Sequence, residues 1–279
     1  MRLADLKEKL LTELKSVLEE REAKNHLAIL LEKVLKMNRA QVVLEKDKII
    51  EEAKVNGLNQ LVAELKKHKP IDYLFNETVF FGRDFFVDER VLIPRPETEE
   101  LVQWILEAES NPNLELIDIG SGSGCIPISL ALEGNYKLID ACDVSEEANQ
   151  VARINAKKFG LSMEFEALDI LKQIPKRQYD VVVSNPPYVK QEELRILNKN
   201  VVEYEPLVAL APEGEPLLFY KRMLAIAPQI LKPGGRLFWE IHEDFGKEIV
   251  ELLQENKFSE IELRQDNYGR DRLVKAVFI

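Results

Sequence analysis

Short apolar segments alternate with helical patterns from residue 114 to the C-terminus, and this alternation restricts the possible folds more than any other feature of the sequence. The strand-like segments are residues 114–119, 137–142, 163–168, 180–184, 236–241, 260–264 and 273–278. The helical segments are residues 125–133, 146–159, 216–231 and 246–255. This pattern predicts an α/β fold with a mostly parallel seven-stranded sheet, covered on both faces by helices. The last two strands can pair as a hairpin through residues 266–270, which makes the last strand antiparallel.

Residues 1–70 follow a different pattern, because leucine and valine recur there at helical spacing and no strand pattern is present. The segment therefore predicts a small helical bundle. Gly57 interrupts the third helical set and marks a bend or a helix end in this interpretation. His26 and His68 have no second ligand at metal spacing, so we expect them on the surface and predict no metal site.

The residues that follow the bundle are aromatic and β-branched. Residues 75–93 surround Gly82 with such side chains and predict a β-hairpin. Pro94 and Pro96 then hold an extended segment, after which a helical pattern begins. We divide the chain into an N-terminal helical domain (1–72), a β-hairpin connector (73–95) and a larger α/β domain (96–279).

The charge distribution bears on possible partners. The chain has a net charge of −11, but residues 1–70 contain 15 basic and 12 acidic side chains, so residues 71–279 carry a net charge of −14. An acidic surface repels phosphate backbones, which argues against direct nucleic-acid binding by the α/β domain. No apolar run is long enough to span a membrane, and the N-terminus has no signal-peptide pattern. Two cysteines do not make a disulfide framework, so we expect a cytoplasmic protein.

A glycine-rich loop lies where the first predicted strand of the α/β domain meets a helix. Its residues are Gly120, Ser121, Gly122, Ser123 and Gly124, directly after Asp118-Ile119. Glycines let a backbone turn sharply and approach a ligand closely. The dinucleotide-binding spacing requires a glycine at position 125, which is cysteine here, so phosphate is not the ligand that this loop predicts.

Acidic residues follow the next two predicted strands. The two oxygens of Asp143 suit the two hydroxyl groups of a ribose. Asp169 could accept a hydrogen bond from an exocyclic amine, with Ile170 as an apolar wall for a base. The alternative interpretation is that each aspartate caps the helix that follows it. Beside the glycine loop these residues favour a nucleoside pocket, and the lack of a phosphate-binding lysine favours S-adenosylmethionine.

The fourth predicted strand ends in Asn185, Pro186, Pro187 and Tyr188. Proline cannot continue a central strand, so the chain leaves the sheet here along a stiff path. The Asn185 side-chain oxygen and the carbonyl that follows it can serve as two fixed acceptors for a planar –NH2 group, and Tyr188 offers an aromatic surface beside it. The alternative is a proline turn with a core tyrosine.

These motifs resemble the HemK/PrmC family of S-adenosylmethionine-dependent methyltransferases, which methylate a glutamine side-chain amide in peptide chain release factors. The resemblance runs from about residue 72 to the C-terminus and is carried by residues 91–99, 118–124, 185–188 and 204–206. It implies a Rossmann-like methyltransferase domain. It also implies that the cofactor contacts Gly120–Gly124, Asp143 and Asn185, and that residues 185–188 hold the glutamine of the Gly-Gly-Gln motif. Ile170 departs from the family, where an aromatic residue is expected.

Two other interpretations stay open from the sequence. One is a methyltransferase for exocyclic amines of RNA or DNA, which shares the Asn-Pro-Pro-Tyr motif but calls for a basic channel. The other is a cofactor-binding scaffold without turnover. We assign no general base, and we expect His242 to be structural. The helical domain has no catalytic constellation, so we expect it to dock the substrate.

Overall fold

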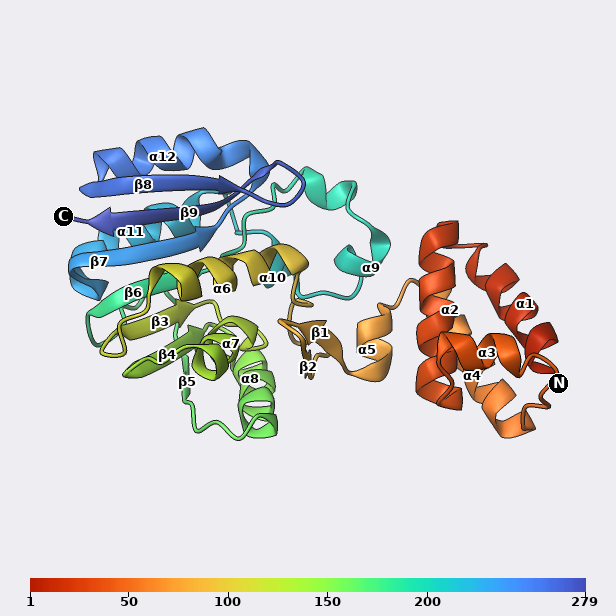
Figure 1. Cartoon of the computed structure of the whole chain (residues 1–279). Coiled ribbons are helices and arrows are strands. Elements are labelled where there is room, and N and C mark those ends of the chain that lie inside the picture. The colour runs from red at the N-terminus through yellow and green to blue at the C-terminus, as the bar shows by residue number, and fades with distance from the viewer. The chain divides into compact units, whose positions relative to one another are not determined.

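The computed structural model describes all 279 residues, Met1–Ile279, and the chain forms two compact units. The first, called the helical unit below, comprises Met1–Phe75 and Asn198–Tyr204. The second, called the sheet unit, comprises Asn76–Leu197 and Glu205–Ile279. In Figure 1 the helical unit is mostly red and orange, and the strands of the main sheet run from green to blue.

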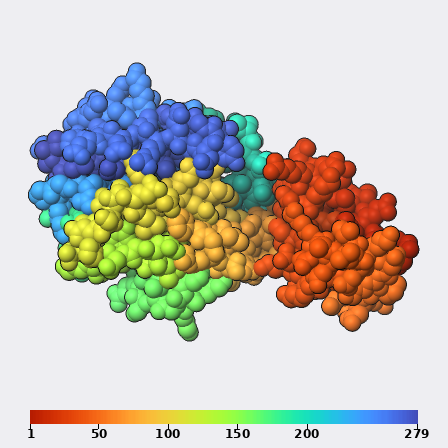
Figure 2. Space-filling view, viewed as in Figure 1, coloured from red at the N-terminus to blue at the C-terminus, as the bar shows by residue number.

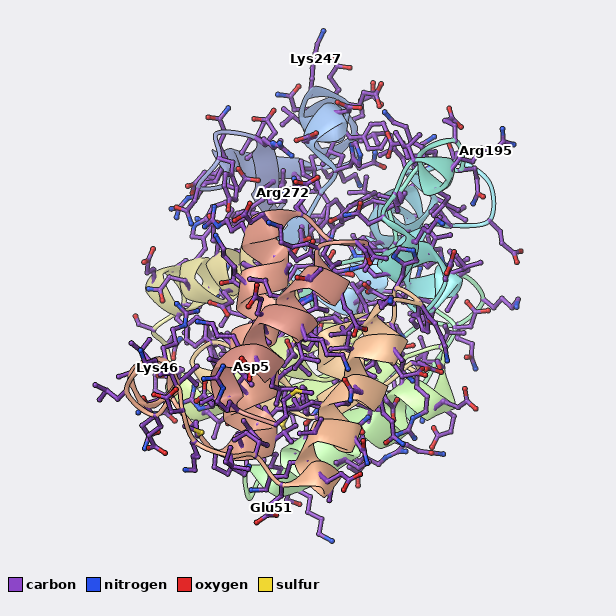
Figure 3. All side chains as sticks on the ribbon, turned by 90° about the vertical axis from the view of Figure 1, so that its right-hand side faces the viewer. Asp5, Lys46, Glu51, Arg195, Lys247 and Arg272 are labelled. Atoms are coloured by element: carbon purple, nitrogen blue, oxygen red, sulfur yellow. The ribbon has the colours of Figure 1, made fainter.

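The helical unit is built around leucine side chains, as the spacing of its leucines predicts. Leu6, Leu30 and Leu58 are fully buried in its core, and charged side chains such as Asp5 and Lys46 lie on its surface (Figure 3). Its helices are α1 (Leu3–Leu14), α2 (Glu20–Leu35), α3 (Arg39–Leu44), α4 (Glu52–Leu65), α5 (Ile71–Phe75) and α9 (Lys199–Val202).

Two expectations for this unit are wrong. Gly57 does not end a helix, because α4 continues through it to Leu65. His26 is half-buried rather than on the surface, and burial lowers the pKa of its imidazole. A glycine can be carried inside a helix when packing of the apolar face stabilises that helix, and α4 buries Val55, Leu58, Val62 and Leu65.

The sheet unit contains the predicted seven-stranded sheet, in the order β5-β4-β3-β6-β7-β9-β8. All neighbouring pairs are parallel except those of β9, which is antiparallel to both β7 and β8. The strands are β3 (Glu115–Ile119), β4 (Leu138–Asp143), β5 (Phe165–Ala167), β6 (Tyr179–Ser184), β7 (Leu231–Glu240), β8 (Phe258–Gln265) and β9 (Asp271–Phe278).

Helices cover both faces of this sheet, as the α/β pattern predicts. One face packs against α11 (Leu218–Ile230) and α12 (Gly246–Glu255). The other packs against α6 (Pro96–Ala108), α7 (Cys125–Glu133) and α8 (Glu146–Lys158). Successive side chains of β7 serve different faces, because Trp239 joins the first core and Phe238 the second. In Figure 2 the yellow α6 and the blue C-terminal strands form one continuous surface.

The remaining elements differ in detail from the sequence pattern. The predicted hairpin is present but short, with β1 (Thr78–Phe80) paired to β2 (Arg83–Phe85). Strand β7 begins before the Pro-Gly-Gly turn, so the turn becomes an irregularity inside the strand. Short helices that the sequence did not predict are η1 (Glu193–Arg195), α10 (Leu207–Leu210) and η2 (Glu243–Phe245). None of the helices combines the length and apolar composition needed to cross a membrane.

Candidate active site

A pocket of about 800 Å³ lies at the carboxyl ends of β4, β3 and β6 in the sheet unit. Its size is in the range of small-molecule sites. Most of the predicted site residues line it, namely Gly120, Ser121, Gly122, Ser123, Asp143, Asp169, Ile170, Asn185, Pro186 and Pro187. Gly124 and Tyr188 are not part of its wall.

The glycine loop is held by hydrogen bonds to the end of β4. The backbone N–H groups of Gly120 and Ser121 both donate to the carbonyl of Cys142, at 2.8 and 3.0 Å. The N–H of Gly122 donates to Asp143 Oδ2 at 2.9 Å, and that of Gly124 donates to the Ser121 carbonyl at 2.8 Å. Because these donors are already used, the loop does not offer the row of free N–H groups that cradles a phosphate.

The two glycines on the pocket wall leave space where a side chain would stand. Gly120 and Gly122 have φ angles of 80° and 52°, and a Cβ atom on either would meet nothing within 4 Å. The Ser121 hydroxyl is buried without a hydrogen-bond partner. The wall therefore combines open space beside the backbone with an unpaired polar group, as a ligand site does.

Gly124 has a packing role instead. Its φ angle is 78°, and a Cβ atom there would lie 3.0 Å from Ile128 and 3.1 Å from Ala152. Behind the loop, Asn155 Nδ2 donates to the Ser123 carbonyl and to the Phe86 carbonyl, both at 2.9 Å. These contacts fix the loop against α7 and α8.

The two strand-end aspartates have different electrostatic environments. Asp143 accepts from the N–H groups of Gly122 and Ser145, both at 2.9 Å, and burial nevertheless raises the pKa of its carboxyl group. Asp169 pairs with Lys172 at 2.8 Å, which lowers the pKa of Asp169. Helix α8 is capped by Ser145, so Asp143 does not serve as the helix cap that the alternative interpretation proposed.

Asn185 reaches the pocket from the end of β6. The preceding Ser184 donates from Oγ to the Ile119 carbonyl at 2.6 Å, which ties the ends of β6 and β3 together. Asn185 Nδ2 donates to Thr98 Oγ1 at 3.2 Å. Thr98 comes from the first turn of α6 and also lines the pocket.

Tyr188 is anchored through its hydroxyl group. The hydroxyl donates to Glu240 Oε1 at 2.8 Å. The ring packs edge-on against the His242 ring, with 5.9 Å between the two ring centroids. Glu240 is buried at the end of β7, and its second oxygen accepts from Thr98 Oγ1 at 2.6 Å.

A salt bridge joins two of the motif stretches. Arg95 Nη2 lies 2.6 Å from Glu205 Oε1, and the N–H of Ile93 donates to Glu205 Oε2 at 3.3 Å. Glu205 is buried, so this pair holds residues 93–95 firmly against the segment that begins at Glu205.

Sequence reasoning missed part of the pocket wall. It assigned no role to Thr98, although the stretch that carries it was singled out as a motif. It also missed the apolar and turn residues of the segment after β6, namely Gln191, Leu194, Pro206, Leu207, Val208, Ala209, Ala211, Pro212 and Glu213. Two signals were available, namely the motif at residues 204–206 and the absence of clear periodicity in residues 189–215, which indicates a long connection.

A buried thiol and a cluster of possible metal ligands have no role in the proposed reaction. Burial raises the pKa of the Cys125 thiol to about 12, so it stays protonated and is a poor nucleophile. Ligand atoms of Glu193, His242 and Asp244 lie within 4.8 Å of one another. However, Lys190 Nζ is 2.5 Å from Asp244 and 3.3 Å from Glu193, so an ammonium group already pairs with both carboxylates of this cluster.

Family comparisons agree with this architecture. Residues 9–75 match the PrmC N-terminal domain, and residues 98–218 match the methyltransferase small domain. The sheet order, the covered faces and this second match define a Rossmann-like methyltransferase.

Individual relatives narrow the class. The chain is 41% identical to the release factor glutamine methyltransferase of Flavobacterium psychrophilum over 95% of both chains. It is 37% identical to that of Bacteroides thetaiotaomicron over 87% of this chain and 88% of the relative. It is 36% identical to that of Bacillus subtilis over 86% of each. The chain belongs to the release factor glutamine methyltransferase family, which confirms the resemblance seen in its motifs.

Solved structures support the fold alone. The catalytic domain of hMettl16, in complex with MAT2A 3′UTR hairpin 6, superimposes with a TM-score of 0.57 at 16% identity, covering 84% of this chain and 95% of that one. A methyltransferase from Pyrococcus furiosus gives a TM-score of 0.52 at 19% identity, covering 80% of this chain and 98% of that one.

The contrast between two loop glycines gives a stability prediction. Gly122→Ala should lose about 1–2 kcal/mol, because only the left-handed backbone opposes the new side chain. Gly124→Ala should lose about 1–3 kcal/mol more, because its methyl group also crowds Ile128 and Ala152. Urea unfolding of both variants measures the difference, and equal losses would contradict the packing role of Gly124.

Asp118 gives a pH prediction. Both of its carboxylate oxygens are buried without partners, and burial, with the nearby Asp143, raises the pKa of Asp118 well above its ordinary value. The unfolded chain therefore releases this proton at lower pH than the folded chain, and the free energy of unfolding falls as pH rises between the two pKa values. When the pH is raised from about 5 to about 8, the free energy of unfolding of Asp118→Asn should fall less than that of the wild type. Urea unfolding at both pH values tests this. The exposed Asp84→Asn is the control, and parallel losses in all three proteins would refute the prediction.

Proposed function

We propose that the chain transfers a methyl group from S-adenosylmethionine to the side-chain amide nitrogen of a glutamine in peptide chain release factors, the glutamine of the Gly-Gly-Gln motif. The observation that carries the proposal is the position of Asn185. It lies on the pocket wall with its Nδ2 bonded to Thr98, which leaves Oδ1 as an acceptor for a ligand. The relatives are named release factor glutamine methyltransferases, and these names suggest the substrate class.

The acceptor groups of the pocket suit the hydroxyl and amine groups of S-adenosylmethionine. Asp143 would accept from the ribose hydroxyls, and Ile170 would form an apolar wall for the adenine base, with Asp169 beside its amine. The loop residues Gly120 and Gly122 leave room for the ligand next to the backbone. Ser121 and Ser123 line the same wall. The negative charge of Asp143 also suits a cationic sulfonium ligand.

The reaction needs positioning more than a strong base. When bound, S-adenosylmethionine supplies a methyl group on a sulfonium sulfur, and the S–C bond breaks as the amide nitrogen forms the N–C bond. Asn185 Oδ1 and the Pro186 carbonyl accept from the two N–H bonds of the glutamine amide. They orient its nitrogen and stabilise the positive charge that develops there. Such positioning can lower a barrier by about 7–11 kcal/mol in favourable cases. The nitrogen then loses its extra proton to solvent.

Pro187 and Tyr188 support this arrangement from behind. Pro187 stiffens the chain as it leaves β6, and Tyr188 is held by Glu240. The sequence suggested the Tyr188 ring as a surface for the flat glutamine amide, but Tyr188 is not part of the pocket wall, so we propose only that it supports the turn. The net charge of −14 on residues 71–279 does not favour a nucleic-acid substrate.

Methyl transfer from labelled cofactor tests the proposed function directly. Purified release factor, the same factor with its Gly-Gly-Gln glutamine changed to alanine, and ribosomal RNA are offered as separate substrates. We expect label in the intact release factor only. Label in RNA, or none in any substrate despite cofactor binding, would overturn the proposal.

Asn185 should contribute most as charge develops on the amide nitrogen. Asn185→Ala is expected to slow single-turnover transfer by about 10²–10³, or roughly 2.7–4 kcal/mol, with a much smaller loss of cofactor affinity. Asn185→Asp keeps the shape and the acceptors, and its negative charge favours a cationic cofactor, but it has no N–H to donate to Thr98 Oγ1, so the side chain loses the contact that orients it. This variant should bind cofactor at least as tightly as the wild type and react more slowly. If both variants transfer the methyl group at the wild-type rate, Asn185 has no role in the reaction and serves only in the turn after β6.

We also propose that the helical unit docks the release factor. It has a hydrophobic core of its own, formed entirely by residues between Leu3 and Phe75. It contributes no residue to the pocket wall. A separate folded unit with no part in the chemistry is suited to hold a large substrate.

Deletion of residues 1–75 tests the docking role. The truncated enzyme should bind cofactor normally and methylate a short Gly-Gly-Gln peptide as the full chain does. Its KM for whole release factor should rise at least about tenfold, the loss expected for roughly 1.4 kcal/mol of docking energy. Calorimetric cofactor binding shows that the truncated protein is folded, and an unchanged KM for whole release factor would disprove docking.

A further inference from the structure

A buried carboxylate connects the two ends of the Asn-Pro-Pro-Tyr element. Glu240 is 1% exposed at the end of β7. Its Oε2 accepts from Thr98 Oγ1 at 2.6 Å, and its Oε1 accepts from the Tyr188 hydroxyl at 2.8 Å. Thr98 Oγ1 in turn accepts from Asn185 Nδ2 at 3.2 Å. The four side chains form one chain of hydrogen bonds from the interior to the pocket wall.

The direction of this chain follows from the chemistry of its members. An ionised carboxylate can only accept hydrogen bonds, and a hydroxyl group has a single proton to donate. Because Glu240 takes the proton of Thr98, the Thr98 oxygen can only accept from Asn185. The Asn185 amide must therefore turn its –NH2 end toward Thr98, which leaves its carbonyl oxygen for the pocket.

The reverse arrangement would present the wrong group to the substrate. If Thr98 donated to Asn185, the Oδ1 atom would face Thr98 and Nδ2 would face the pocket. Two –NH2 groups, those of Asn185 and of the substrate glutamine, would then meet with no acceptor between them. Such an unpaired contact disfavours binding and transfer alike.

Surrounding groups bear on the charge of Glu240. The pKa of Glu240 is raised overall, chiefly by burial, and the hydrogen bonds from Thr98 and Tyr188 and the positive charge of Arg272 oppose this rise. Arg272, from β9 and labelled in Figure 3, acts on this carboxylate through its charge, while its guanidinium group pairs with Asp266 at 3.3 Å and donates to the Ile241 carbonyl at 3.1 Å. The two hydroxyl donors each satisfy one oxygen of this buried carboxylate, as a buried polar group requires.

We infer that Glu240 and Thr98 are positioning residues that determine which end of the Asn185 amide faces the substrate, and that Glu240 holds Tyr188 through the same carboxylate. The inference rests on the proposed function, since it gives Asn185 Oδ1 the role of acceptor. It adds two residues from α6 and β7 that do not touch the reacting atoms.

Two substitutions at Thr98 separate the hydroxyl group from the shape of the side chain. Thr98→Val keeps the shape and removes the hydroxyl, whereas Thr98→Ser keeps the hydroxyl. Thr78→Val is the matched control, because Thr78 is also buried but lies in β1, outside the pocket wall. Thermal unfolding of each variant reports any loss of fold. Glu240→Gln tests the same hydrogen bond from the side of its acceptor.

We expect Thr98→Val to slow single-turnover methyl transfer to release factor by about 10- to 100-fold. Its Kd for S-adenosylmethionine by calorimetry should stay within about twofold of the wild type, a difference of about 0.4 kcal/mol. Thr98→Ser and Thr78→Val should react at close to the wild-type rate. Glu240→Gln should be slow as well, because its amide places a donor against Thr98 or Tyr188.

A second readout reports the amide orientation itself. A release factor whose target glutamine is changed to glutamate offers the site only acceptors, so the wild type should bind it poorly as a competitive inhibitor. In Thr98→Val the Asn185 amide is free to turn its –NH2 end outward. The inhibition constant of the glutamate factor, relative to the KM of the glutamine factor, should therefore fall in this variant but not in Thr78→Val.

The outcomes distinguish this inference from the proposed function. A wild-type enzyme that does not methylate release factor would refute the proposed function. An active wild type with an equally active Thr98→Val would refute the positioning role alone. Equal slowing by Thr98→Val and Thr98→Ser would also refute it, because the hydroxyl group would then not be the cause.

Discussion

The pairing of β3 with β4 on one side and β6 on the other is the constraint on which the site depends. Ile119 lies opposite Cys142 and Asp118 opposite Val183, all in parallel register. The carboxyl ends of the three strands therefore meet at one edge of the sheet, where the strand order changes direction and ligands bind in open α/β sheets. This pairing brings the glycine loop and the Asn-Pro-Pro-Tyr element together.

Many of the polar groups on the pocket wall are acceptors, although Arg90, Arg95 and Lys172 also line the pocket. The loop amides are bound to the Cys142 carbonyl and to Asp143, and the remaining polar groups of the wall include carboxylates, an asparagine oxygen and backbone carbonyls. Acceptors suit hydroxyl groups, amines and a sulfonium, and they repel phosphates.

Two long-range contacts connect the motif of residues 91–99 to the rest of the sheet unit. Arg95 pairs with Glu205, 110 residues away, and Thr98 bonds to Glu240, 142 residues away. Both acidic partners are buried. Removal of the Arg95 charge or of the Thr98 hydroxyl would leave a buried carboxylate oxygen with one fewer partner, which is costly. Residues 91–99 therefore connect the pocket wall to the end of β7 and to the segment that begins at Glu205.

The sequence by itself determined the order of strands and helices, the helical nature of residues 1–70, and the loop and strand-end residues of the pocket. Periodicity, glycine and proline act through the local backbone, so each can be read within a few residues. Only the tertiary structure decided that Gly124 packs inward, that Tyr188 is anchored by Glu240, and that residues 198–204 belong to the helical unit. The reason is physical. The partner of a buried polar group depends on which strands become neighbours, and no local pattern carries that information.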